Sequence, residues 1–119
     1  MKFLSNFRKN RTMKSYIMKL PKLLVKDYGG KSQKYSPKQI RKTAERHGLN
    51  LEYIGFGIAM FSSKSEFISY ANKFNVKWNY KNMRSEIGDN FFGGDTSFNI
   101  VFPKKSSLYR VDDGDLWRM

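Results

Sequence analysis

The sequence predicts an all-α fold, a compact bundle of about five helices followed by an extended C-terminal segment. Three observations support this. Apolar residues recur every three or four positions over residues 13–28, which is the spacing of one helix face. Typical helix N-cap residues stand before three later segments, at Ser36, Ser63 and Asn79. Residues 50–61 are apolar on nearly all sides, as expected of a buried central helix.

Residues 13–28 predict an amphipathic helix with a basic outer stripe. Its apolar side consists of Met13, Tyr16, Ile17, Leu20, Leu24 and Tyr28. Basic residues follow on the opposite side at steps of three or four, since successive helical residues are about 100° apart. Pro21 lacks a backbone donor and restricts Leu20, so we expect two shorter helices here instead of one. Gly29 and Gly30 then end the segment.

Residues 35–48 carry the clearest helix signals in the chain. These are Ser36 at the N-cap, Pro37 at N1, Gln39 at N3 of a capping box, and Gly48 where a left-handed cap would end the helix. Tyr35 and Ile40 occupy the two positions of a hydrophobic staple. A helix over this segment follows from local chemistry alone.

The stretch 50–61 allows two interpretations. We favour a helix that Asn50 caps. The alternative is an α+β fold with residues 53–61 as a strand, since glycines alternate there with large apolar residues as in the aromatic strand of RNA-recognition modules. Against that alternative, Ile54 replaces a basic residue of the motif and Ile58 replaces a stacking aromatic.

Two further helices are predicted before the chain changes character. Residues 62–74 open with a capping box, Ser63 and Glu66. The apolar face of this helix is Phe67, Ile68, Tyr70, Ala71 and Phe74. Residues 79–92 place Tyr80, Met83, Ile87 and Phe91 on one side. Gly93 and Gly94 end that helix.

The chain therefore divides into a helical domain over residues 1–94 and an extended tail over residues 95–119. Phe98, Ile100 and Phe102 alternate with other residues, which is typical of extended backbone. These side chains would be costly to leave in water, so we expect the tail to pack on the domain or on a partner. A second copy of the chain could be that partner, giving a homodimer.

Charge is the most informative feature of the composition. The net charge is +13, and residues 1–47 hold 14 of the 23 Lys and Arg residues but two of the 10 acidic ones. A field this one-sided favours an acidic partner. The absence of cysteine excludes disulfides, thiolate zinc sites and cysteine nucleophiles. The longest nearly uncharged run, residues 53–63, is too short to span a bilayer, so we expect a cytoplasmic protein.

These features predict a small non-enzymatic protein that binds nucleic acid or another polyanion, without metal or cofactor. The binding residues would form one positive face: Arg8, Arg11, Lys19, Lys22, Lys26, Lys38, Arg41, Lys42 and Arg46. An alternative is an interaction module of a mobile element or phage that docks an acidic protein.

A small carboxylate-based enzyme is the third possibility. Its candidate acids are Glu45, Glu52, Glu66 and Glu86, each of which also has a local explanation on a helix. The single histidine, His47, is expected at a helix C-terminus, where a cation is favourable. Asp112, Asp113 and Asp115 fit a solvated turn better than a calcium loop.

The pattern KSYIMKLPKLLVKDYGG, followed by YSPKQIRKTAERHGLNLEYIGFGIAMFSSKSEF, resembles a family of small bacterial proteins of unknown function. The resemblance covers roughly residues 8–92. It implies a compact helical domain and no catalytic residues.

Overall fold

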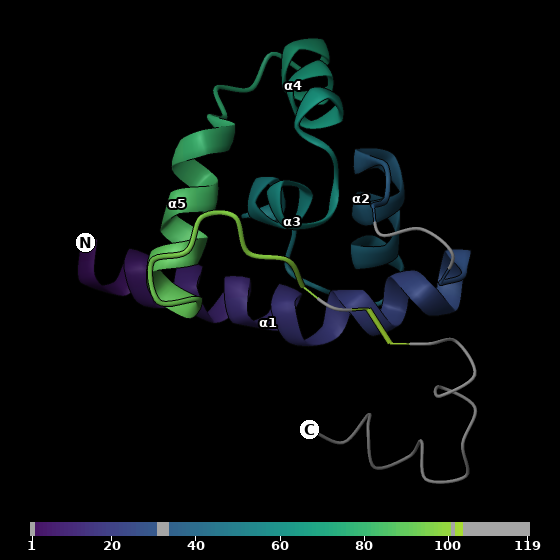
Figure 1. Ribbon diagram of the computed structural model, residues 1–119, viewed down its shortest axis with the longest axis horizontal. Coiled ribbons are helices and arrows are strands. Elements are labelled where there is room, and N and C mark those ends of the chain that lie inside the picture. The colour runs from purple at the N-terminus through teal and green to yellow at the C-terminus, as the bar shows by residue number, and fades with distance from the viewer. Residues whose placement is uncertain (1, 31–33, 101, 104–119) are drawn as a thin grey trace, which may run out of the picture.

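A computed structural model describes residues 2–30, 34–100 and 102–103. Across these ranges it contains helices and no strand. The helices are α1 (Lys2–Tyr28), α2 (Pro37–Arg46), α3 (Ile54–Phe61), α4 (Lys64–Lys73) and α5 (Tyr80–Phe91). The predicted all-α fold is confirmed, and the alternative with residues 53–61 as a strand is wrong. Figure 1 shows α1 along one edge of the molecule, α3 at the centre, and α2, α4 and α5 around it.

The predicted break at Pro21 is also wrong, because α1 runs through it as one helix of 27 residues. Pro21 cannot donate to the carbonyl of Ile17, a loss of about 3 kcal/mol in a helix interior. Leu20 and Leu24, on either side of it, have no exposed surface and lie in the main hydrophobic core. Helices in proteins gain most of their stability from such packing, which here outweighs the local penalty.

The predicted signals of α2 are confirmed at both ends. The Ser36 hydroxyl accepts from the Gln39 backbone at 3.1 Å, and the Gln39 side chain accepts from the Ser36 backbone at 3.0 Å. Gly48 has a φ of +72°, and the N–H groups of Gly48 and Leu49 donate to the carbonyls of Glu45 and Ala44. This Schellman motif stops the helix and turns the chain toward α3.

All eight residues of α3 are buried, as predicted for a central helix. Its start differs from the prediction: Asn50 does not cap it. The Asn50 carbonyl accepts from the Tyr16 hydroxyl, and the Ile54 N–H donates to Leu51 at 3.1 Å. The helix therefore begins at Ile54, after a turn that α1 holds in place. Because Phe56 and Phe61 face the core, this segment offers no aromatic ring to a nucleic-acid base.

Helices α4 and α5 begin at the predicted caps, where the side chains of Ser63 and Asn79 accept from backbone N–H groups. The predicted apolar face of α4 is only partly buried. Phe67 and Ala71 are in the core, but Ile68 and Phe74 are 43% and 51% exposed. Phe74 occupies the C-cap, where the chain leaves the helix, and it therefore does not follow the side chains of the preceding turns inward.

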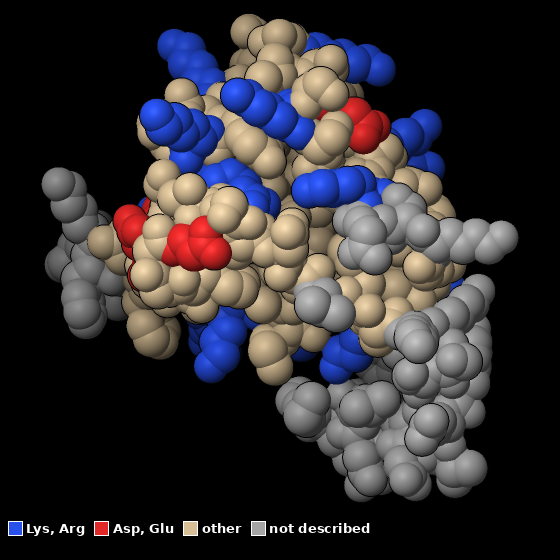
Figure 2. Space-filling model, viewed as in Figure 1, with Lys and Arg blue, Asp and Glu red and all other residues tan. Residues whose placement is uncertain are grey.

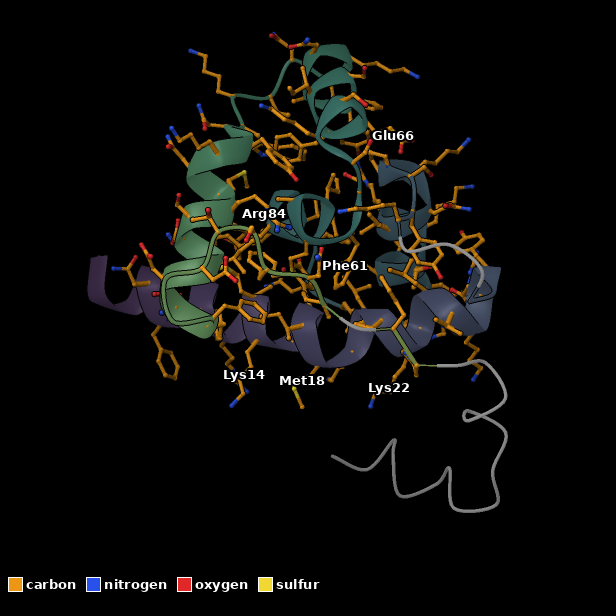
Figure 3. The ribbon with its side chains drawn as sticks, viewed as in Figure 1. Lys14, Met18, Lys22, Phe61, Glu66 and Arg84 are labelled. Carbon is orange, nitrogen blue, oxygen red and sulfur yellow. The ribbon has the colours of Figure 1, made fainter. Side chains whose placement is uncertain are left out.

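The described residues after α5 pack back across the helices, as Figure 1 shows. Phe98 is buried and stacks on Phe92 with ring centroids 4.4 Å apart. Phe102 lies edge-on to Tyr35 at 5.3 Å. Arg84 of α5 points toward this segment and α3 in Figure 3 and donates to the carbonyls of Ala59, Thr96 and Phe98. Leu108 and Trp117, two further apolar residues of the tail that we expect to be costly to leave in water, lie outside the described residues.

Helix α1 is the longest described helix, and it has one side buried in the bundle and the other exposed. In the described residues, no helix combines the length and the apolar character that crossing a membrane requires.

Candidate functional site

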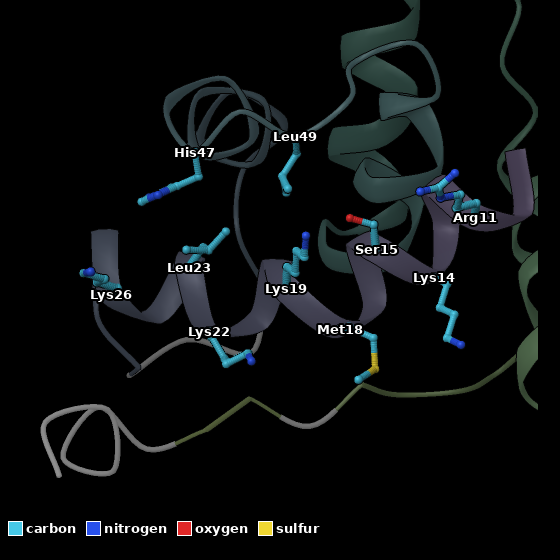
Figure 4. Close-up of a pocket in the computed structure, with 10 residues that line it drawn as sticks. All are labelled: Arg11, Lys14, Ser15, Met18, Lys19, Lys22, Leu23, Lys26, His47 and Leu49. Carbon is cyan, nitrogen blue, oxygen red and sulfur yellow. The ribbon is translucent and has the colours of Figure 1, made fainter. Parts of the chain in front are cut away.

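A groove of about 530 Å³ runs along the outer side of α1 and reaches the turn after α2. Figure 4 shows its lining: Arg11, Lys14, Ser15, Met18, Lys19, Lys22, Leu23, Lys26, His47 and Leu49. Five of these ten side chains are cationic Lys or Arg and none is a carboxylate. The groove is therefore a concentrated source of positive potential.

The cations come from one helix because of their spacing. Residues three or four apart lie on the same side of a helix. The lining residues of α1 that follow one another at such steps are Arg11, Ser15, Lys19, Lys22 and Lys26. Figure 3 shows Lys14, Met18 and Lys22 pointing away from the other helices. Figure 2 shows Lys and Arg side chains projecting from the same lower edge of the molecule. Because the opposite side of α1 is buried, folding fixes which way these cations point.

The groove also has an apolar component. Met18 is 51% exposed between the cations, and Leu23 and Leu49 form part of the wall on the α2 side. An exposed methionine on a helix surface is adaptable, because its unbranched side chain can conform to different partners. The site can thus combine charge with limited hydrophobic contact.

Neither acid of the N-terminal part lines the groove, and both pair with arginines of α2. Asp27 accepts from Arg46 at 2.6 Å, and Glu45 lies 3.4 Å from Arg41. Within the described part of the chain, Arg11, Lys14 and Lys19 form no ion pair with a carboxylate. The described ion pairs therefore leave the charge of these three side chains uncompensated.

Asp27 is the centre of the junction between α1 and α2. Its carboxylate accepts from the buried Thr43 hydroxyl at 2.9 Å and lies 3.2 Å from His47 Nε2. Partial burial would raise the pKa of Asp27, but the hydrogen bonds from Thr43 and His47 and the nearby charges of His47 and Arg46 together lower it below the ordinary value. Asp27 thus stays ionised and holds His47 at the end of the groove.

The structure separates the nine predicted binding residues into three groups. Arg11, Lys19, Lys22 and Lys26 line the α1 groove, and Arg8 lines an adjoining hollow together with Arg11. Lys38, Arg41 and Lys42 line a different cleft, between α2 and α4. Arg46 is paired with Asp27.

Of the ten residues that line the α1 groove, the predicted binding set contains four; Lys14 and Met18 are among the six that it missed. Both were recoverable: Lys14 stands three residues after Arg11, and Met18 stands between Lys14 and Lys22 at helical spacing. On the α2–α4 cleft it missed Lys73 and Phe74. No sequence signal could place those two beside α2, because that contact depends on how the helices pack.

The candidate acids of a carboxylate enzyme lie apart in structural roles. Glu45 pairs with Arg41, Glu86 pairs with Lys9, and Glu66 accepts from the Ser63 hydroxyl at its helix cap. Glu52 is exposed in the turn before α3. Over the described ranges, no three His, Asp or Glu side chains gather as a metal site would require. Asp112, Asp113 and Asp115 lie outside the described residues.

Comparison with known proteins identifies one family. The model of DUF6559, described as a family of unknown function, matches residues 4–105. No curated protein and no solved structure matches the chain.

Proposed function

Since the chain belongs to DUF6559, whose function is not known, we propose from the geometry that it binds nucleic acid through the cationic groove of α1. The observation that carries this proposal is the lining of the groove, which has five cations and no carboxylate. Phosphates meeting these side chains would displace condensed counterions, which is the main source of affinity in non-specific nucleic-acid binding.

The shape of α1 supports the proposal. The helix rises about 1.5 Å per residue, so the cations from Arg8 to Lys26 extend over roughly 27 Å. Duplex DNA carries one negative charge for about every 1.7 Å of its axis, so several phosphates lie within that length. An elongated row of this kind suits a polymer better than a small anion.

The chemistry of the groove favours phosphate contacts over base reading. Lys and Arg dominate it, and it contains no Asn or Gln that could pair with an adenine edge. A helix-turn-helix arrangement of α2 and α3 would need a polar face on α3, but α3 is buried throughout. We therefore propose binding with little sequence preference.

The test is the salt dependence of binding to a short DNA duplex, followed by fluorescence anisotropy. If about five cations engage phosphates, the slope of log K against log salt should be about −4 to −5. The triple substitution Arg11→Glu, Lys14→Glu, Lys19→Glu should weaken binding at least tenfold and flatten the slope by about three. Circular dichroism and thermal melting should stay unchanged, since none of the three side chains is in the core.

A matched control separates this groove from a general effect of charge. Lys64, Lys77 and Lys81 are exposed on and near α4 and α5. The triple change of these lysines to Glu gives the same net charge but should leave most of the affinity. Equal losses in both triple variants, or a wild-type dissociation constant no tighter than about 10⁻⁴ M, would contradict the proposal.

A second candidate function is favoured by the apolar side chains of the groove. Met18 is half exposed beside the cations, and an acidic protein helix could bury it while its carboxylates pair with lysines. For such a partner, Met18→Ala should weaken binding more than Lys14→Ala. For DNA the order should be reversed, because phosphate contacts need the charge.

A further inference from the structure

The cleft between α2 and α4 is a second cationic site, and it shares no lining residue with the groove of α1. Its volume is about 340 Å³. Helix α2 contributes Lys38, Arg41, Lys42 and Glu45, and α4 with its cap contributes Tyr70, Lys73 and Phe74. Four cations face one carboxylate, so the cleft selects an anionic ligand.

This cleft differs from the α1 groove in having aromatic rings. Phe74 is 51% exposed, and its ring centroid lies 4.5 Å from that of Tyr70. Tyr70 in turn stacks on Trp78 at 5.8 Å, with the ring planes 9° apart. The three rings form a connected row in which Phe74 is the exposed end.

Two features hold this aromatic row in a fixed position. Arg41 donates to the Tyr70 hydroxyl at 3.2 Å, which ties the row to α2. Helix α4 ends in a Schellman motif, with Asn75 at a φ of +53° and the Val76 N–H donating to Ala71 at 3.0 Å. Phe74 is therefore held at the helix cap, outside the core.

We infer that the α2–α4 cleft binds single-stranded nucleic acid, with a base stacked on Phe74 and the flanking phosphates held by Lys38, Lys42 and Lys73. An exposed ring gives any base a stacking surface, and neighbouring amines hold the backbone, which is how single strands are bound without sequence readout. Within the described residues, these three lysines have no carboxylate partner. Duplex DNA cannot use the ring, because its bases are already stacked.

This inference rests on the proposed function only in taking nucleic acid as the ligand. The α2–α4 cleft is a separate site from the α1 groove. The experiment compares a thymidine hexanucleotide with an abasic hexamer of equal length and charge. The wild-type protein should bind the thymidine oligonucleotide about tenfold more tightly, a gain typical of one base on one aromatic ring. Phe74→Ala and Phe74→Leu should abolish this preference, and Phe74→Tyr should retain it.

Control variants make every outcome decisive. Ile68→Ala changes another exposed apolar residue of α4, outside the cleft, and should leave the preference intact. The α1 triple variant should lose duplex affinity but keep the preference for bases, so failure of one site is distinguishable from failure of the other. Equal affinity of the wild-type protein for both hexamers, or a preference that survives Phe74→Ala, would overturn the inference. A competition experiment with an acidic peptide of equal charge gives a further check. If the peptide displaces the thymidine hexamer and the affinity for the peptide is unchanged by Phe74→Leu, the inference is also overturned.

Discussion

At the scale of single residues, Asp27 determines how positive charge is distributed. It is the single acidic residue of α1 (Lys2–Tyr28), and it pairs with Arg46 of α2. Asp27 joins the two helices by accepting hydrogen bonds from Thr43, Arg46 and His47. Its negative charge therefore offsets the charge of Arg46 and not the charges of the lysines and Arg11 that line the groove. Arg46 was predicted to bind a polyanion, but this pairing favours a structural role for it.

We expect Asp27→Ala to lower the free energy of unfolding by about 1–3 kcal/mol at neutral pH, because it leaves the fully buried Thr43 hydroxyl without its acceptor. Asp27→Asn, which keeps an acceptor for Thr43 but loses the charge, should cost less. Urea denaturation of both variants measures the difference. If Asp27→Ala were as stable as the wild type, the junction would not contribute to folding.

The pH dependence of these variants follows from the lowered pKa of Asp27. A carboxyl whose pKa is lower in the folded state stabilises the protein above its unfolded pKa, near 4, and loses this contribution as pH falls through the folded value. The stability gap between wild type and Asp27→Asn should therefore be constant above about pH 5 and shrink below about pH 4. A gap that widens on acidification would contradict the assignment.

At the scale of elements, the sequence predicted correctly those helix ends that capping residues determine. The capping box of Ser36 and the left-handed Gly48 set α2 within a few residues, so the sequence was sufficient there. Pro21 and Asn50 were misjudged because tertiary contacts decide both positions. The packing of Leu20 and Leu24 carries α1 through the proline. The Asn50 side chain, expected to cap α3, instead accepts from the Glu52 N–H and donates to the Thr12 hydroxyl of α1.

Two helical glycines give a prediction at this scale. A Cβ on Gly57 would lie 3.4 Å from Leu20 and Tyr16, an ordinary contact, but a Cβ on Gly88 would lie 2.5 Å from the Asp95 carbonyl oxygen. Gly57→Ala should therefore be neutral or stabilise by up to about 1 kcal/mol through helix propensity. Gly88→Ala should destabilise by about 1–3 kcal/mol, because the backbone of residues 95–96 must move.

Thermal melting of the two variants, side by side, tests this packing. The same chemical change is made in the interior of two helices, so a difference in melting temperature reports on surroundings alone. If the melting temperature of Gly88→Ala equals or exceeds that of Gly57→Ala, the segment after α5 does not lie against the helix.

At the scale of the whole molecule, the sequence predicted a basic face but not its division. All nine predicted residues are basic and lie on α1 or α2 as expected, yet the arrangement of the helices places Lys38, Arg41 and Lys42 in a different cleft from Arg11 and Lys19. Periodicity fixes the side of each helix on which a residue lies. It contains no information on which neighbouring helix completes the site, and so Lys73 and Phe74 were not predicted.

The segment after α5 links the helices around one buried cation. Arg84 is 8% exposed, and its guanidinium lies 3.7 Å from the centre of the Phe98 ring. Burial lowers the pKa of Arg84 below that of an exposed guanidinium, yet an arginine still keeps its proton. Its charge is therefore stabilised by carbonyl groups, two of which, on Thr96 and Phe98, belong to the C-terminal segment.

Removing residues 95–119 should consequently lower the melting temperature by about 10 °C or more, since it uncovers Phe92 and leaves Arg84 with a single described acceptor, Ala59. The substitution Arg84→Met should recover part of this loss in the truncated protein but destabilise the full-length chain, because only truncation deprives the Arg84 charge of its Thr96 and Phe98 carbonyl acceptors. Differential scanning calorimetry of the four proteins gives the coupling, and sedimentation velocity shows whether truncation also changes the oligomeric state. If truncation leaves both the melting temperature and the oligomeric state unchanged, the C-terminal segment does not stabilise the fold, and Arg84 must keep its charge satisfied without it.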